Sequence, residues 1–204
     1  RNNPASWSLC ACAPIQGLQL AYYDYDTRIL GKSVNLSYIL EPMYLLSDRS
    51  RLSVRGAVGL SYLTNPHNGT SNPTNQSYST AVSGYLALGV RYEYQFAKKW
   101  SIGPMVQFQH ISNGGLQEPN KGINWPTAGL MTTYRPNASQ LQRFERASFI
   151  KREGIRWDIG LFAIAKRVWG QDDGITKRFF LMGLTAQAAW QVGRINNLTV
   201  GTEI

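Results

Sequence analysis

The chain has 204 residues, enough for one medium domain or one barrel, and its 21 Lys and Arg against 12 Asp and Glu give a formal net charge of +9. Such a balance suits nucleic acid, acidic lipid headgroups or other phosphate-rich partners, but no nucleic-acid-binding motif occurs and the basic residues are scattered except in 143–156. The sequence therefore predicts no nucleic-acid partner, and it holds no apolar run of the about 18 residues that a transmembrane helix needs.

The two ends of the chain carry little information about chemistry. Cys10 and Cys12 are the two cysteines; they are too close in sequence for an ordinary bridge, and their number excludes a disulfide framework or a thiolate metal site. The first residues show no signal peptide, and residues 197–204 look like a strand that stops midway. We expect the chain to be a piece of a longer one that lacks its leader and final strands.

Between the ends, apolar and polar residues alternate with a period of two, which predicts β-strands. In 52–62, for example, Leu52, Val54 and Val58 share one face while Ser53 and Arg55 share the other. In chain order, the alternating segments are 15–25, 34–44, 52–62, 82–96, 100–112, 155–165 and 178–192.

These segments are longer than the about five or six residues of a typical globular strand and match the about 9–11 that cross a bilayer. Their charged residues lie opposite the apolar face, at Arg55, Arg91, Glu93, Arg156 and Asp158. This pattern is typical of an all-β, antiparallel transmembrane β-barrel, apolar toward lipid and polar toward the lumen. We predict one partial barrel domain over residues 1–204 with eight or more strands. A soluble β-sandwich or lipocalin-like barrel, which would bury the apolar face, is the alternative.

The connections predict which way the strands run. Segments 46–51 and 97–100 are short, as periplasmic turns are, whereas 64–80 is long and rich in turn residues, as an outer loop is. His67 in this long loop is expected to be an ordinary surface residue. Segment 135–153 breaks the rule: it should be periplasmic, yet it is long and basic, with a partly helical stretch expected around 139–152.

A histidine and a serine end the segment 100–112. His110 and Ser112 are two residues apart, so they share its apolar, lipid-facing side. The strand starts at a short turn, which places this pair level with the outer leaflet. Polar side chains there are costly unless they are used or lie near the interface.

These residue types can form a hydrolase site. A serine becomes nucleophilic when an imidazole takes its proton, and the imidazole needs a third group to fix its tautomer. Asn113, Gly114, Gly115 and Asn120 follow at once and can supply N–H donors to an oxyanion. By itself, however, His-x-Ser is a weak motif.

The longer stretch H-I-S-N-G-G-L-Q-E-P-N-K-G-I-N, His110–Asn124, resembles the motif of the outer-membrane lipid A 3-O-deacylase family (acyloxyacyl hydrolase-like). The resemblance covers core strands in 15–134, and the strands in 154–204 are additional to it. It implies a bacterial outer-membrane barrel without cofactor or metal that cleaves an acyl ester of lipid A (lipopolysaccharide) in the outer leaflet. It makes His110 the general base and Ser112 the nucleophile, and it places Asn113, Gly114, Gly115 and Asn120 on the oxyanion side.

The sequence departs from the family's motif at the acid position, where Asn124 stands. Its amide oxygen can still accept the imidazole N–H, but it lacks the charge that stabilises an imidazolium. Glu118 is a possible substitute acid, although a solvated loop carboxylate is expected.

Three functions therefore remain open. The first is a lipid A esterase. The second is a phospholipase similar to outer-membrane phospholipase A, which has a Ser–His–Asn arrangement and requires calcium. The third is a non-catalytic structural barrel or pore. Basic residues near the loop ends would either hold lipid A phosphates or be ordinary solvated charges.

Overall fold

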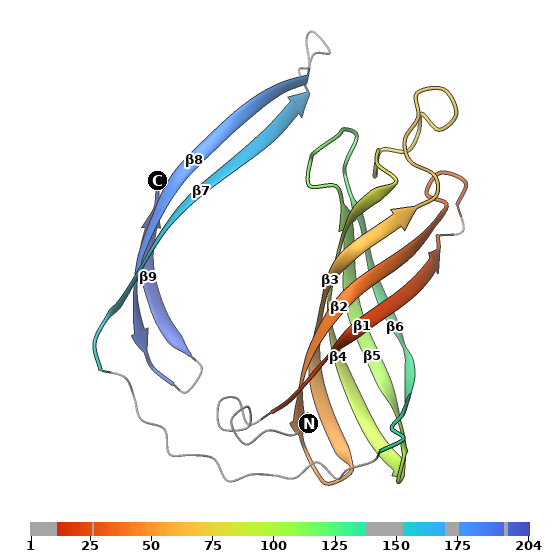
Figure 1. Ribbon diagram of the computed structural model, residues 1–204, viewed down its shortest axis with the longest axis vertical. Coiled ribbons are helices and arrows are strands. Elements are labelled where there is room, and N and C mark those ends of the chain that lie inside the picture. Colours follow the sequence, from red (N-terminus) through yellow and green to blue (C-terminus); the bar gives the residue numbers. More distant parts are fainter. Residues whose placement is uncertain (1–11, 26, 138–152, 170–175, 194–195) are drawn as a thin grey trace. The chain divides into compact units, whose positions relative to one another are not determined.

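The computed structural model describes residues 12–25, 27–137, 153–169, 176–193 and 196–204. Its described elements are β-strands in two antiparallel sheets that belong to two compact units (Figure 1). Over these ranges no helix is long and apolar enough to cross a membrane. The expected partly helical stretch at 139–152 lies outside the described residues.

The first sheet has six strands, and each pairs antiparallel with its neighbour in sequence. The strands contain 12 to 16 residues, so each is long enough to cross a bilayer when tilted. They are β1 (Ala13–Asp24), β2 (Lys32–Leu45), β3 (Ser50–Leu63), β4 (Val82–Ala97), β5 (Trp100–Ser112) and β6 (Ile123–Tyr134). The predicted short turns and the long loop between β3 and β4 are confirmed.

The second sheet has three strands in the order β7-β8-β9. Their bounds are β7 (Arg156–Trp169), β8 (Thr176–Gln191) and β9 (Asn197–Glu203). The alternating segments 155–165 and 178–192 predicted the first two of these strands. With nine strands described in antiparallel sheets, the all-β barrel class is confirmed.

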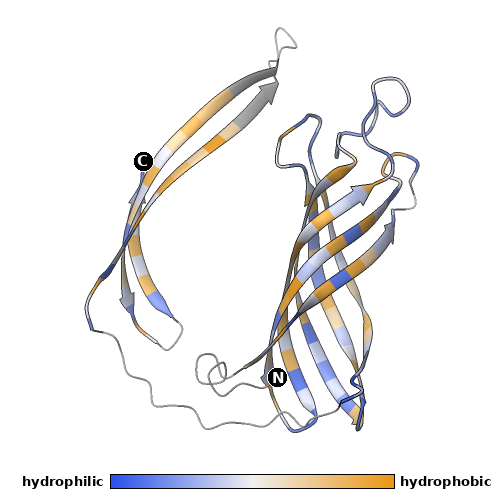
Figure 2. Cartoon of the chain, viewed as in Figure 1, coloured by the Kyte–Doolittle hydropathy of each residue, from blue (hydrophilic) through white to orange (hydrophobic). Residues whose placement is uncertain are grey.

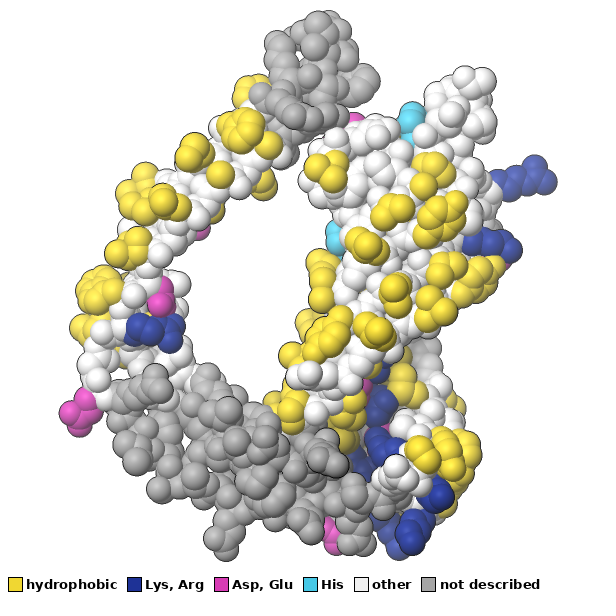
Figure 3. Space-filling model, in the orientation of Figure 1, with side chains coloured by type: hydrophobic (Ala, Val, Ile, Leu, Met, Phe, Trp, Pro, Cys, Tyr) yellow, Lys and Arg dark blue, Asp and Glu magenta, His cyan; other side chains and the backbone are white. Residues whose placement is uncertain are grey.

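The polarity of the first sheet is the reverse of that in a soluble protein. Apolar side chains point outward, with Leu18 77% and Leu130 78% exposed, while Glu41 is 1% and Arg51 4% exposed. Bands of opposite hydropathy alternate along each strand (Figure 2), and hydrophobic side chains spread over the surface of these strands (Figure 3). A soluble sandwich would bury the apolar face instead, so the transmembrane barrel is the interpretation that holds.

Paired charges fill one end of the inward face. Glu41 Oε2 lies 2.9 Å from Arg55 Nη1, and Glu93 Oε1 lies 2.7 Å from Arg51 Nη1 and 2.8 Å from Arg135 Nη1. Buried charges are tolerated when they are paired and hydrogen-bonded in this way. The network therefore lets a charged interior coexist with an apolar exterior.

An aromatic cluster fills the other end, beneath the long loops. Tyr23 and Tyr85 both donate hydrogen bonds to Gln109 Oε1, at 2.6 and 2.7 Å. The Trp125 ring packs edge-on against Tyr23 and Tyr25, with centroids 5.3 and 5.5 Å apart. Because Tyr23 lies on β1 and Trp125 on β6, the sheet curls far enough at this end for side chains of its two edge strands to pack against each other. Side chains, rather than an open channel, occupy this part of the interior.

Three local features differ from the sequence-based expectations. Strand β6 was not among the alternating segments, because Pro126 and Gly129 interrupt its pattern. Cys12 is disulfide-bonded, so the expectation that its spacing prevents a bridge is wrong. His67 is half-buried rather than freely exposed, and its Nδ1 lies 3.0 Å from the carbonyl oxygen of Asn75.

Candidate active site

Strand β5 carries the histidine and the serine to the end of the sheet where the long loops lie. His110 pairs with Leu86 on β4 and with Asn124 on β6, and Ser112 pairs with Gly84. Both side chains share the face that bears the exposed Val106 and Phe108. The site therefore opens on the apolar outer surface of the sheet, as the even spacing of these residues predicts.

Asn124 forms a direct hydrogen bond with His110. Its Oδ1 lies 2.7 Å from His110 Nδ1, across adjacent antiparallel strands. An amide oxygen only accepts hydrogen bonds, so this contact assigns the imidazole proton to Nδ1 and leaves Nε2 free to accept a proton. That is the tautomer that a general base for a serine hydroxyl requires.

Two N–H donors converge on the serine. The Asn120 side-chain amide donates to Ser112 Oγ at 2.9 Å, and the Gly114 backbone N–H donates at 3.1 Å. The hydroxyl in turn donates to Asn120 Oδ1 at 3.3 Å. In the described part of the chain Ser112 is bonded to these groups and not to His110, so a substrate has to redirect the hydroxyl toward the imidazole.

Asn113 and Gly115 shape the loop of residues 113–122, here called the site loop. The Asn113 amide is buried and donates to the carbonyl oxygen of Gln117 at 2.8 Å, while its Oδ1 accepts the Gly115 N–H at 2.9 Å. Gly114 and Gly115 have φ values of 68° and 77°, which favour glycine. The side chain of Asn113 thus supports the loop, whereas Gly114 and Asn120 face the serine.

Glu118 does not contact the histidine in the described structure. Its Oε2 accepts the backbone N–H of Asn120 at 2.8 Å. The half-buried carboxylate therefore helps to hold Asn120 in place. Of the two residues considered for the third position, Asn124 is the one that reaches the imidazole.

The long loop between β3 and β4, residues 64–81, also supports the site, which the sequence did not indicate. Its Gln76 and Ser77 carbonyl oxygens accept the N–H groups of Lys121 and Gly122, at 3.0 and 2.8 Å. Gly122 has a φ of 74°, and a Cβ atom there would lie 3.0 Å from His110 Cε1. No spacing or motif distinguishes these loop residues, because every residue has a backbone carbonyl and a contact made through it does not depend on residue type.

Comparison with known families identifies the family to which the chain belongs. The family model described as Lipid A 3-O-deacylase (PagL) matches residues 13–134, which is more than half of the chain and includes β1–β6 with the whole site. The chain belongs to the lipid A 3-O-deacylase (PagL) family. No curated protein and no solved structure gives a match.

Membership of the PagL family makes the chain a carboxylic ester hydrolase of the lipid A deacylase type. The PagL match ends with β6, so β7–β9 lie beyond it. The stretch from His110 to Asn124 therefore lies within the matched residues, on the end of β5, the site loop and the start of β6.

Proposed function

We propose that this chain is an outer-membrane serine esterase that removes an ester-linked acyl chain from lipid A. The observation that supports it best is the contact between His110 and Asn124 beside Ser112, on an outward face that is otherwise apolar. An ester whose acyl chains lie in the outer leaflet can reach this face sideways from the membrane.

The positions of these groups support the following reaction, which is part of the proposal. Ser112 Oγ attacks the ester carbonyl carbon while His110 Nε2 takes the hydroxyl proton. The Gly114 N–H and the Asn120 amide donate to the oxyanion that forms. The bond from carbon to the sugar oxygen then breaks, the imidazolium returns its proton to the leaving alcohol, and an acyl-enzyme remains on Ser112. Water, deprotonated by His110, releases the fatty acid.

Asn124 has a limited role in this sequence. It fixes the Nδ1–H tautomer and the orientation of the ring, but it brings no negative charge to the imidazolium. We therefore expect a slower acylation step than a carboxylate at position 124 would give.

The substitution of position 124 tests this mechanism. Asn124→Leu keeps a similar size without an acceptor and should lower kcat at least about tenfold, because the imidazole loses its orientation. Asn124→Glu should raise kcat above that of the unmutated protein by about tenfold, since it adds charge. The measurement is fatty-acid release from lipid A by protein refolded in detergent micelles. Equal kcat for all three proteins would contradict the role of Asn124.

A phospholipase is the second candidate, because the Ser112, His110 and Asn124 set resembles the Ser–His–Asn arrangement of outer-membrane phospholipase A. The same three proteins should therefore be assayed on phosphatidylethanolamine, with calcium and with EDTA. Calcium-dependent release of lysophospholipid, with intact lipid A, would favour this candidate over the deacylase.

A further inference from the structure

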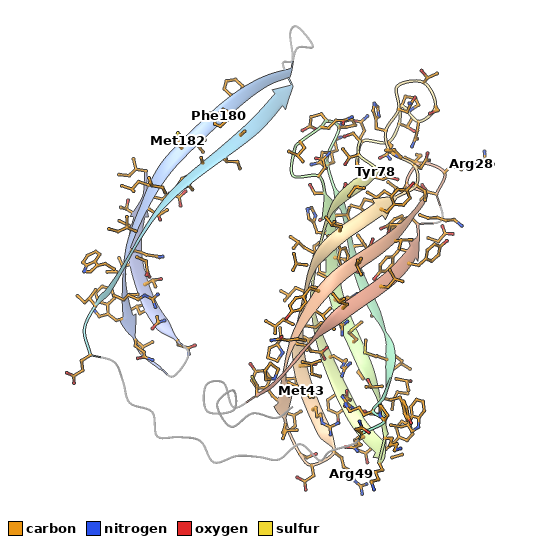
Figure 4. All side chains as sticks on the ribbon, in the orientation of Figure 1. Arg28, Met43, Arg49, Tyr78, Phe180 and Met182 are labelled. Carbon is orange, nitrogen blue, oxygen red and sulfur yellow. The ribbon has the colours of Figure 1, made fainter. Side chains whose placement is uncertain are left out.

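The long loop (residues 64–81) is built into the end of the sheet. Tyr78 is fully buried, and its hydroxyl donates to the carbonyl oxygen of Leu30 at 2.6 Å (Figure 4). The buried Asn75 donates to the carbonyl oxygen of Ile29 at 3.3 Å. These anchors connect the loop to the β1–β2 turn and fix its far side relative to the strands.

The other side of the long loop holds the site loop. Ser79 is 7% exposed, and its hydroxyl donates to the carbonyl oxygen of Gln117 at 2.8 Å while accepting from the Asn113 amide at 3.3 Å. Asn113 and Gln117 are the two ends of the tight turn that contains Gly114. One buried hydroxyl therefore joins both ends of that turn.

The bonds of Ser79 to Asn113 and Gln117 act on the turn that contacts Ser112 Oγ. The turn between Asn113 and Gln117 presents the Gly114 N–H to Ser112 Oγ at 3.1 Å. The Asn113 N–H lies 3.2 Å from Asn120 Oδ1, so the side chain that donates to the serine is oriented from the same turn. A shift of the turn would move both oxyanion donors together.

We propose that Ser79 is a positioning residue of the active site, which keeps the Gly114 and Asn120 donors aimed at the reacting oxygen through its bonds to Asn113 and Gln117. The inference rests on the proposed function, because it concerns the same esterase step. Among the hydrogen bonds of the described residues, Ser79 bonds to Asn113 and Gln117 and not to Ser112, so it acts through the site loop.

A positioning role differs from a merely structural one in its kinetic signature. Loss of the Ser79 hydroxyl should misplace donors that act in the transition state, and so lower kcat while KM stays within about twofold. A misplacement of about 1 Å costs up to about a hundredfold in rate. A residue that only stabilises the fold would lower the melting temperature and leave the kcat of the folded protein unchanged.

The experiment compares Ser79→Ala, Ser79→Thr and Ser71→Ala with the unmutated protein in micelles. Ser71 is an exposed serine on the same loop and serves as the matched control. We expect kcat for fatty-acid release to fall about ten- to a hundredfold in Ser79→Ala, to recover in Ser79→Thr and to be unchanged in Ser71→Ala. Hydrogen exchange at the Gly114, Lys121 and Gly122 amides should become faster in Ser79→Ala alone.

The outcomes separate this inference from the proposed function. An active unmutated protein with an equally active Ser79→Ala would overturn the positioning role and leave the esterase in place. A fall in kcat that Ser79→Thr does not restore, with unchanged exchange at the site loop, would overturn it as well. Inactivity of the unmutated protein on lipid A and on phospholipid would overturn the proposed function, and the positioning role with it.

Discussion

At the scale of single residues, the site depends on close packing around one imidazole. Gly122 lies against the Cε1 and Nδ1 atoms of His110 with φ at 74°, and Asn124 Oδ1 lies 2.7 Å from the same Nδ1. The ring is therefore positioned by a backbone that leaves little room for a side chain and by an amide that fixes its proton. Orientation, rather than a charged partner, is what the chain supplies to its base.

Substitution of Gly122 tests this packing. Gly122→Ala would place Cβ 3.0 Å from both His110 Cε1 and the Ile111 carbonyl oxygen, and a side chain at positive φ costs about 1–3 kcal/mol. We expect kcat to fall at least about tenfold as the ring shifts. Gly129→Ala on β6 is the control, because a Cβ there meets nothing within 4 Å. Equal losses in both variants would show that the effect is not specific to the imidazole.

The residues of the site differ in how far the sequence revealed them. His110, Ser112 and Asn124 follow from strand spacing together with a long motif, and the structure brings all three to one exposed face. Asn113 was expected on the oxyanion side, but its amide is turned toward Ser79 and Gln117. Ser79 could not be identified from the sequence, because in a loop rich in serine and asparagine nothing distinguishes a buried serine from a solvent-exposed one.

At the scale of elements, the strands of the first sheet are stable only if their inward charges stay paired. Glu93 accepts hydrogen bonds from Arg51, Arg135 and Ser101, at 2.7, 2.9 and 3.0 Å, and also from Arg91. One carboxylate on β4 thus connects β3, β5 and the residue that follows β6.

Removal of the Glu93 carboxylate should lower the free energy of unfolding severely. Glu93→Gln leaves buried guanidinium groups without their counter-charge, and breaking a buried pair in this way costs about 3–5 kcal/mol. The unfolding midpoint in urea, followed by heat-modifiable gel mobility in micelles, is the measurement. Asp158→Asn, which breaks the exposed pair with Arg156, should leave that midpoint unchanged. A midpoint for Glu93→Gln that equals the control would contradict the role of the network.

Strands could be predicted from the sequence where apolar and polar residues alternate without interruption. They could not be predicted where the alternation is interrupted. Strand β5 coincides with the predicted 100–112. In β6, Pro126 pairs with Phe108 at the edge of the described sheet, where a missing N–H is tolerated. The pattern could not find that strand, because its regularity comes from pairing with β5 rather than from its own residues. The packing of the long loop could not be predicted either, because it depends on contacts with other segments rather than on the loop's own residue pattern.

At the scale of the whole molecule, the decisive property is that the first sheet exposes apolar side chains and buries charged ones, the reverse of a soluble protein. Six strands expose their apolar residues and bury their charges, so the six-stranded sheet is stable with lipid around it rather than water. The site lies on that lipid-facing side, at the end where the long loops are. This arrangement supports the proposal that the chain takes an acyl ester from within the membrane.

The most direct test of this account is mass spectrometry of lipid A and phospholipids from bacteria whose outer membrane contains either the unmutated protein or Ser112→Ala. The account predicts lipid A that is lighter by one ester-linked acyl chain with the unmutated protein, and intact lipid A with Ser112→Ala at equal abundance in the membrane. Lipid A of unchanged mass with both proteins would contradict it.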